Sequence, residues 1–284
     1  MTATTALYCR AAAIILRVAA CLMTLAVADA AQAQSRLRAH YTISMTGVSV
    51  GQIVWLISIG DQRYTTSASG KASGVLSVLV NGEGAVDVRG VIVDGRPQPK
   101  FYTSNITDDE GKSELRVTFD DGVAKETPAH EPPKAPPSSD RIPVTEADRR
   151  GVADPLSAML IPTDLGPLGP AYCDRVLSIF DGRRRYDLIL SFKRFDKIAL
   201  EKSYSGPVLV CGVVLKPIAG YRADSLLVKY VGGRRDMELW FVPIGDTPFI
   251  APVRVSMPTL VGTLEILADQ FEFIPNSAPP VPRQ

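Results

Sequence analysis

The longest run of basic residues is the triplet Arg183–Arg185, which follows an Asp-Gly turn signal. Guanidinium groups suit phosphate and carboxylate ligands, so the triplet is a candidate anion site. In a strand that begins near Arg183, the side chains of Arg183, Arg185 and Asp187 share one face, and most apolar residues share the other. This pattern favours a strand with one solvated face, on which Arg185 and Asp187 form a surface pair. The alternative is that Arg183 and Arg185 bind an anionic headgroup at the mouth of a cavity.

Cys173 and Cys211 form an even pair outside the first 33 residues. In an oxidising compartment two such thiols form a disulfide by default, and here it would close a loop of about 40 residues. A metal site would need further ligands, and this part of the chain holds only His40 and His130 and no Cys-x-x-Cys. A catalytic thiol would need a histidine as base, which no sequence signal supplies. The pair therefore predicts a disulfide and no metal site.

The sequence predicts neither a catalytic nor a cofactor-binding motif. We find no phosphate-binding loop, no dinucleotide-binding glycine fingerprint and no His-Glu-x-x-His, and we expect no nucleophile elbow. Two histidines also leave little for a histidine-based site. The sequence therefore predicts a protein that is not an enzyme and needs no cofactor.

Apolar residues offer a different kind of site. Trp55 and Trp240 would either line a ligand pocket or anchor the core. The segment 207–215, "PVLVCGVVL", is apolar on both faces of a strand, so both faces should be covered by protein or ligand. A β-shell with an apolar interior is a usual container for a hydrophobic ligand.

Residues 1–33 have the layout of a cleaved secretory signal. Arg10 and Arg17 supply positive charge, Val18–Ala28 is an apolar run, and "AQA" precedes a cleavage point before Gln34. The apolar run is shorter than the roughly 20 residues that span a bilayer. We expect a soluble exported protein that is not an integral membrane protein. The alternative is a lipoprotein cleavage box, "VAAC", that would leave a lipid anchor on Cys21.

Export also fixes the charge of the remaining chain. Removing Arg10, Arg17 and Asp29 from 31 basic and 30 acidic residues leaves 29 of each, a net charge of zero. Nucleic-acid binders usually carry a basic excess, because counterion release from phosphates supplies their affinity. The sequence therefore predicts no nucleic-acid partner.

Strand patterns dominate the chain after the signal. In "AHYTISM", residues 39–45, apolar and polar residues alternate as in a half-buried strand, and further segments of this kind are separated by Gly, Asp or Asn. Residues 71–82, "KASGVLSVLVNG", fit either a short helix or a buried strand. The fold class predicted is all-β and mainly antiparallel, a barrel or curved half-barrel with one or two short helices.

Prolines mark the boundaries of this organisation. Residues 125–144 contain six prolines and predict a long surface loop, either an insertion or a docking segment for a partner. Residues 145–160 are the best helix candidate, with Thr145 or Asp154 as N-cap and Pro155 at the first helical position. We expect a single domain over 34–274, because either side of the loop alone would leave open strand edges. The proline-rich tail, 275–284, is predicted to be disordered.

Several segments together resemble the DUF3108 family of exported bacterial proteins. They are "YTISMTGVSVGQIVWLIS", "ADPLSAML", "YCDRVLSIFDGRRRYDL", "CGVVLKPIAGY" and "LWFVPIGDTPFIAPVRVSMPTLVGTLEI", and the resemblance covers roughly residues 36–273. It implies a periplasmic, β-rich protein of a family without an assigned function. It also implies an architecture similar to lipoprotein carriers of the LolA/LolB type, whose curved sheet holds acyl chains. No catalytic residue is carried over.

These observations lead to two functional hypotheses. The first is a periplasmic, non-enzymatic binding protein for a hydrophobic or amphiphilic envelope molecule, a lipid or a lipid-modified partner such as a lipoprotein. Trp55, Trp240, Arg183 and Arg185 are its candidate ligand-binding residues. The alternative is a protein–protein interaction module of the cell envelope, with a filled core and no ligand cavity. The presence of an apolar inner space distinguishes them.

Overall fold

A computed structural model describes residues 35–73, 82–108, 111–128, 140–200 and 203–274. Four segments lie outside the described residues: the predicted signal segment, the centre of the proline-rich loop, most of the ambiguous segment 71–82 and the C-terminal tail. Gln34–Ser277 form one compact unit. Within the described ranges, no helix has both the length and the apolar character that crossing a membrane requires.

The described unit consists almost entirely of antiparallel strands, which confirms the predicted fold class. The strands are β1 (Ser35–Met45), β2 (Val48–Ile59), β3 (Arg63–Ala72), β4 (Gly82–Val93), β5 (Arg96–Asp108), β6 (Gly111–Asp120), β7 (Val123–Pro128), β8 (Ile161–Pro162), β9 (Arg175–Phe180), β10 (Arg185–Ala199), β11 (Ser205–Ala219), β12 (Met237–Pro243), β13 (Phe249–Thr259) and β14 (Gly262–Ile274). The helical turns are η3 (Ala147–Arg149), α2 (Pro155–Ala158), η4 (Pro170–Cys173) and α3 (Leu226–Val231).

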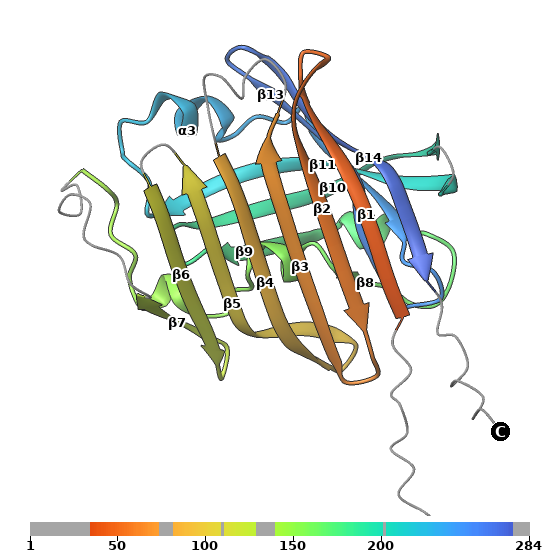
Figure 1. Ribbon diagram of the computed structural model, residues 1–284, viewed down its shortest axis with the longest axis horizontal. Helices are drawn as coiled ribbons and strands as arrows, with labels where there is room; N and C mark the ends of the chain where they lie inside the picture. The colour runs from red at the N-terminus through yellow and green to blue at the C-terminus, as the bar shows by residue number, and fades with distance from the viewer. Residues whose placement is uncertain (1–34, 74–81, 109–110, 129–139, 201–202, 275–284) are drawn as a thin grey trace, which may run out of the picture. The chain divides into compact units, whose positions relative to one another are not determined.

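One continuous sheet wraps around an apolar interior. Its strand order is β7-β6-β5-β4-β3-β2-β1-β14-β13-β12-β11-β10-β9, and β8 pairs with β13. Figure 1 shows β1–β6 as a front layer with β9–β11 crossing behind it. The main core lies between the layers, because Ile57 and Val88 of the front layer belong to the same buried cluster as Val210 and Val242 of the back layer. The sheet is thus a nearly closed barrel.

A short segment of chain joins the two ends of this sheet. Arg150 bridges to Val123 of β7, and Ala153 bridges to Ile179 of β9. Gly151 has a φ of 63°, a conformation that glycine adopts without a Cβ penalty. We call residues 150–153 the closing segment.

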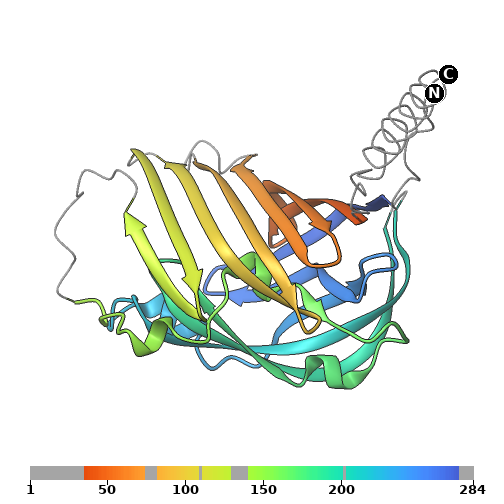
Figure 2. The ribbon, with the colours of Figure 1, turned by 90° about the horizontal axis from the view of Figure 1, so that it is seen from below.

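The closing segment corrects the helix prediction for 145–160. Two single turns form there, η3 and α2, because the residues between them pair with the sheet instead of continuing a helix. The predicted cap is present: Asp154 accepts hydrogen bonds from the backbone N–H groups of Leu156 and Ser157, and Pro155 begins α2. Figure 2 shows α2 between the two layers.

Strand β11 is covered on both faces, as its apolar sequence predicts. Val208 and Val210 belong to the main core, whereas Leu209 and Cys211 belong to a second core on the other face. That second core is covered by residues around η4 and by Val231 of α3. Cys173 and Cys211 form the predicted disulfide there, with their Cα atoms 5.5 Å apart. The disulfide ties η4 to the sheet.

Candidate functional site

The inner face of the front layer carries a row of small and apolar residues. Ile53, Gly70, Gly84 and Ile106 are register partners across β2, β3, β4 and β5. Two glycines therefore lie side by side between two isoleucines. A Cβ at Gly84 would contact only Asn105 and Ile106 of the neighbouring strand among described atoms. No described atom of the back layer lies within 4 Å of this Cβ position.

The next row toward α2 adds two more small or apolar residues. Ala68 pairs with Trp55 and with Val86, and all three point inward. We call the following set the inner apolar patch: Ile53, Ala68, Gly70, Gly84, Val86 and Ile106.

Burial along these strands divides the interior into two halves. Every member of the inner apolar patch is at least partly accessible, and Ile106 keeps 46 % of its surface exposed. The next inward positions toward α2, Ile57, Thr66, Val88 and Tyr102, are buried. The interior is thus packed near α2 and accessible near the β1–β2 turn, at the upper end of Figure 1.

The back layer repeats this division. On β11, the inward positions Val210 and Gly212 are buried, whereas the next inward position, Val214, is half-buried. Val214 pairs with Ile189 of β10, which is 38 % exposed. Val214 and Ile189 are thus accessible apolar residues of the back layer, whereas the register partner of Gly212 on β12 is the charged Glu238.

A small polar cluster lies at the packed end. The Tyr64 hydroxyl and the Ser157 hydroxyl are 2.6 Å apart, and Ser157 follows the capping residue Asp154 in α2. Asp154 is fully buried, and its Oδ2 atom has no hydrogen-bond partner among the described residues. Burial raises the pKa of Asp154 above its usual value, and burial together with the Asp154 charge raises the pKa of Tyr64. These groups hold α2 against the front layer.

Both tryptophans lie in the main core. Trp55 is 5 % exposed and donates a 2.6 Å hydrogen bond to Thr66, and Trp240 is 7 % exposed. The guanidinium groups of Arg194 and Arg254 lie 5.2 and 4.6 Å from the centre of the Trp240 ring.

Glu238 completes the charged group beside Trp240. It accepts hydrogen bonds from Arg194 and from the Trp240 indole, and forms an ion pair with Lys193. These donors lower the pKa of Glu238 to about 2, against the opposing effect of its partial burial. The sequence pattern gave no signal for this group, because its members come from three different strands.

The candidate arginines are separated by the turn before β10. Arg183 lies on the exposed turn and donates to the Ser113 hydroxyl of β6 at 2.9 Å. Arg185 is only 9 % exposed, and its ion pair with Asp187, at 2.6 Å, is largely buried. The pair predicted for the solvated face exists, but both side chains are largely buried, which corrects its placement on the surface. Neither arginine lies beside Trp55 or Trp240 in any contact of the described residues.

Comparisons with known proteins identify the family. A family model described as "Protein of unknown function (DUF3108)" matches residues 40–269. The chain belongs to the DUF3108 family. No curated protein matches it.

Several solved protein chains resemble this DUF3108 chain. One of them is the crystal structure of a beta-barrel-like protein of domain of unknown function DUF1849 from Brucella abortus. The two share 12 % identity over 86 % of this chain and 98 % of that chain, with a TM-score of 0.48. A likeness of this size carries no information about the site.

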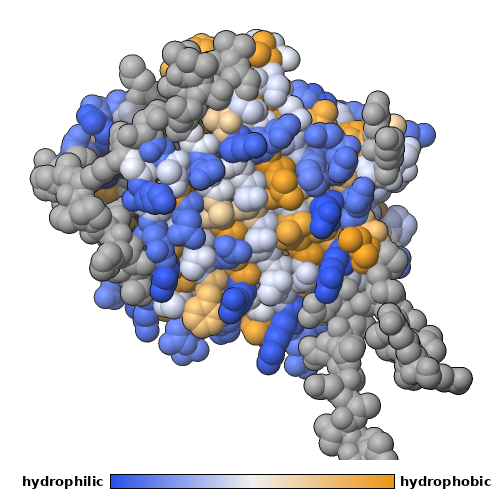
Figure 3. Space-filling view, in the orientation of Figure 1, coloured by the Kyte–Doolittle hydropathy of each residue, from blue (hydrophilic) through white to orange (hydrophobic). Residues whose placement is uncertain are grey.

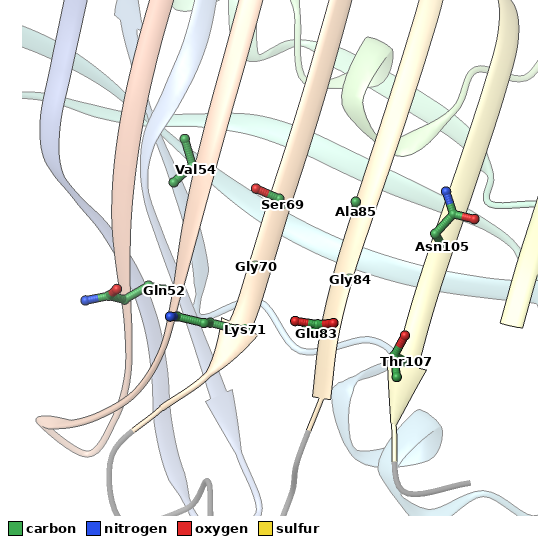
Figure 4. Close-up of a pocket in the computed structure, with 10 residues that line it drawn as sticks. All are labelled: Gln52, Val54, Ser69, Gly70, Lys71, Glu83, Gly84, Ala85, Asn105 and Thr107. Atoms are coloured by element: carbon green, nitrogen blue, oxygen red, sulfur yellow. The ribbon is translucent and has the colours of Figure 1, made fainter. Parts of the chain in front are cut away.

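A hollow of about 390 Å³ lies on the outside of the DUF3108 barrel. Figure 4 shows its side chains on the outer face of β2–β5, with Lys71 beside Glu83. Gln52, Asn105 and Thr107 add further polar groups. Figure 3 shows that hydrophilic side chains are common on this face. A polar, shallow lining does not suit a hydrophobic ligand.

One motif in the DUF3108 chain has catalytic spacing without the matching structure. Gly47–Gly51 spells Gly-x-Ser-x-Gly, the spacing of a nucleophile elbow. Only Gly47 lies in the turn between β1 and β2; Val48–Gly51 begin strand β2, where Ser49 pairs with Ser44. The strand–turn–helix that exposes an elbow serine does not form around this motif. Among the described residues, no group of three or more His, Cys, Asp or Glu side chains is arranged to hold a metal ion.

Proposed function

We propose that this protein is a periplasmic, non-enzymatic binding protein for a hydrophobic or amphiphilic envelope molecule, a lipid or a lipid-modified partner. The apolar chain of that molecule would lie on the inner apolar patch, between the two layers. The observation that carries the proposal is the exposure of inward-facing apolar residues, above all Ile106, in a barrel whose other half is packed.

The chemistry of the patch supports an acyl or similar chain. Its members carry no charge and no side-chain hydrogen-bonding group, so contact there gains free energy through burial of apolar surface alone. The adjacent glycines Gly70 and Gly84 leave room for a chain to approach the backbone. Burial of Ile106 by a ligand would remove apolar surface that the folded barrel alone leaves in water.

The competing function is a protein-interaction module of the envelope. It requires no ligand on the inner face, and it predicts that filling the inner apolar patch leaves binding of the partner protein unchanged. Its support is the fully packed core around Trp55 and Trp240.

Native mass spectrometry with lipid extraction tests the proposal. The protein is expressed with its signal, recovered from the periplasmic fraction without detergent, and weighed intact. We expect a stoichiometric lipid adduct on the wild-type protein. A bare protein mass, repeated after incubation with vesicles of envelope lipids, would refute lipid binding and favour the interaction module.

A pair of substitutions places the ligand. Gly84→Leu puts a side chain on the inner apolar patch, and Ala85→Leu puts the same side chain on the outer face of the same strand. We expect the first to reduce lipid occupancy at least tenfold and the second to leave it unchanged. Equal occupancy in both variants would show that the lipid binds elsewhere. Thermal unfolding of each variant checks that both are folded.

A further inference from the structure

A second hollow, of about 660 Å³, lies at the seam where the sheet closes. Strand β5 and the β6–β7 turn form one side, and the closing segment and β9 form the other. The lining includes Arg96, Lys100, Asp121, Ala153, Val176 and Ser178. We call it the seam groove.

Strand β9 presents an unpaired edge to the seam groove. The Ser178 carbonyl accepts from the Ala153 N–H, and the Phe180 N–H donates to the Ala153 carbonyl, so alternate residues of β9 turn their backbone groups away from β10. Val176 has the same orientation, but the closing segment does not extend alongside it. Its backbone has no hydrogen-bond partner among the described residues, and its side chain is 55 % exposed.

The groove also carries an excess of positive charge. Arg96 and Lys100 line it against one acidic residue, Asp121, and Arg175 adjoins it at the start of β9. None of the three basic residues has an ion-pair partner in the described part of the chain. The Nε atom of Arg175 is buried without a hydrogen-bond acceptor among the described residues. Burial and the charge of Arg96 lower the pKa of Arg175. An acidic group in the groove would relieve this repulsion.

We propose that the seam groove binds an extended, acidic polypeptide segment of a partner protein, which adds as a strand to the edge of β9. The backbone of Val176 would hydrogen-bond to the segment, as in strand addition to other sheet edges. Arg96 and Lys100 would pair with its carboxylates and select it against neutral or basic segments. The site uses no residue of the inner apolar patch.

Backbone NMR of the exported chain tests strand addition directly. The probe is a capped heptapeptide of alternating glutamate and valine. We expect it to shift the amide signals of Val176, Leu177 and Ser178 and to slow hydrogen exchange at Val176. The same peptide with alternate backbone nitrogens methylated should bind at least tenfold more weakly, because it cannot complete the ladder. A lysine–valine peptide should not bind.

Matched variants separate backbone pairing from charge. Val176→Pro removes the N–H that faces the groove but no bond to β10, whereas Val176→Thr keeps it. We expect at least a tenfold loss of peptide affinity in the first and none in the second. Arg96→Gln with Lys100→Gln should weaken binding at least fivefold, whereas Lys71→Gln on the outer face of β3 should not.

Three results would overturn the proposal: no signal change at millimolar glutamate–valine peptide, equal binding of the methylated peptide, or unchanged binding by Val176→Pro. The second and third would mean a charge attraction without strand addition. Gly84→Leu should leave peptide binding unchanged, so failure of this proposal and failure of lipid binding are recorded separately.

Discussion

Opening the disulfide between Cys173 and Cys211 should lower the free energy of unfolding by about 4 kcal/mol. The two residues are 38 positions apart in sequence. In the chain-entropy model, a loop of this length restricts the unfolded chain by about 13 cal/mol/K, which is about 4 kcal/mol at 25 °C. Because a domain of this size shifts its Tm by roughly 2–4 °C per kcal/mol, the expected decrease is about 8–16 °C.

Urea unfolding of the oxidised and the dithiothreitol-reduced protein measures this effect. Fluorescence reports the transition well, because both Trp55 and Trp240 are buried in the main core. Reduction leaves both sulfur atoms in place. The difference between oxidised and reduced protein therefore measures the effect of the cross-link, without the effect of altered packing in the second core. The Cys173→Ala, Cys211→Ala double variant should lose more, because each cysteine is fully buried there. A difference below about 1 kcal/mol between oxidised and reduced protein would refute the reasoning.

Three further predictions concern stability. The pKa of Asp154 is raised in the folded state, so ionisation of this carboxyl destabilises the fold as pH rises through that pKa. The Asp154→Asn variant should therefore be more stable than the wild type at pH 8 and lose this advantage toward pH 4. The Asp154→Ala variant should lose the helix cap, which is worth about 1 kcal/mol. Glu238 has its pKa lowered from 4.5 to about 2, so its contribution is present above pH 4.5 and lost as pH falls to about 2; Glu238→Gln should be less stable at pH 7 and equal to the wild type near pH 2. Gly182→Ala should cost more than Gly122→Ala, because both have positive φ (91° and 73°) but only a Cβ at Gly182 would overlap Leu115. Urea midpoints across pH and thermal unfolding measure all three.

Each of these predictions has an outcome that contradicts it. A pH-independent difference for Asp154→Asn would mean that the carboxyl is not desolvated as the structure has it. If the Glu238→Gln variant is as stable as the wild type at pH 7, the charged group beside Trp240 does not stabilise the fold. Equal costs for the two glycine variants would mean that the turn before β10 does not pack on β6.

Local sequence signals predicted the elements of this protein well. Alternation in residues 39–45 predicts a strand with Tyr41 inside, and the pattern holds because a half-buried strand must alternate. The apolar segment 207–215 predicts a strand covered on both faces for the same reason. The capping role of Asp154 also followed from local chemistry, since the side chain bonds to N–H groups two and three residues away.

Longer-range features were less predictable. The segment 145–160 has helical signals, but pairing of the closing segment with β7 and β9 decided its conformation, and that pairing joins residues far apart in sequence. The Arg185–Asp187 pair was predicted for a wet face because strand alternation cannot show what packs over a strand. Gly47, Ser49 and Gly51 have the spacing of a nucleophile elbow, but the strand–turn–helix that such an elbow requires does not form there.

By itself, the sequence determined the all-β class, the DUF3108 resemblance and the pairing of Cys173 with Cys211, because alternation, motif order and an even cysteine count are properties of the chain read locally. The tertiary structure alone decided which faces are inside. It placed Gly70 beside Gly84, with Ile53 and Ile106 at the two ends of the same row. This register depends on every hairpin of the front layer. It also left the backbone of Val176, at the start of β9, without a hydrogen-bond partner among the described residues and near two basic residues of β5. Both proposed sites arise from strands brought together by folding, which no local pattern contains.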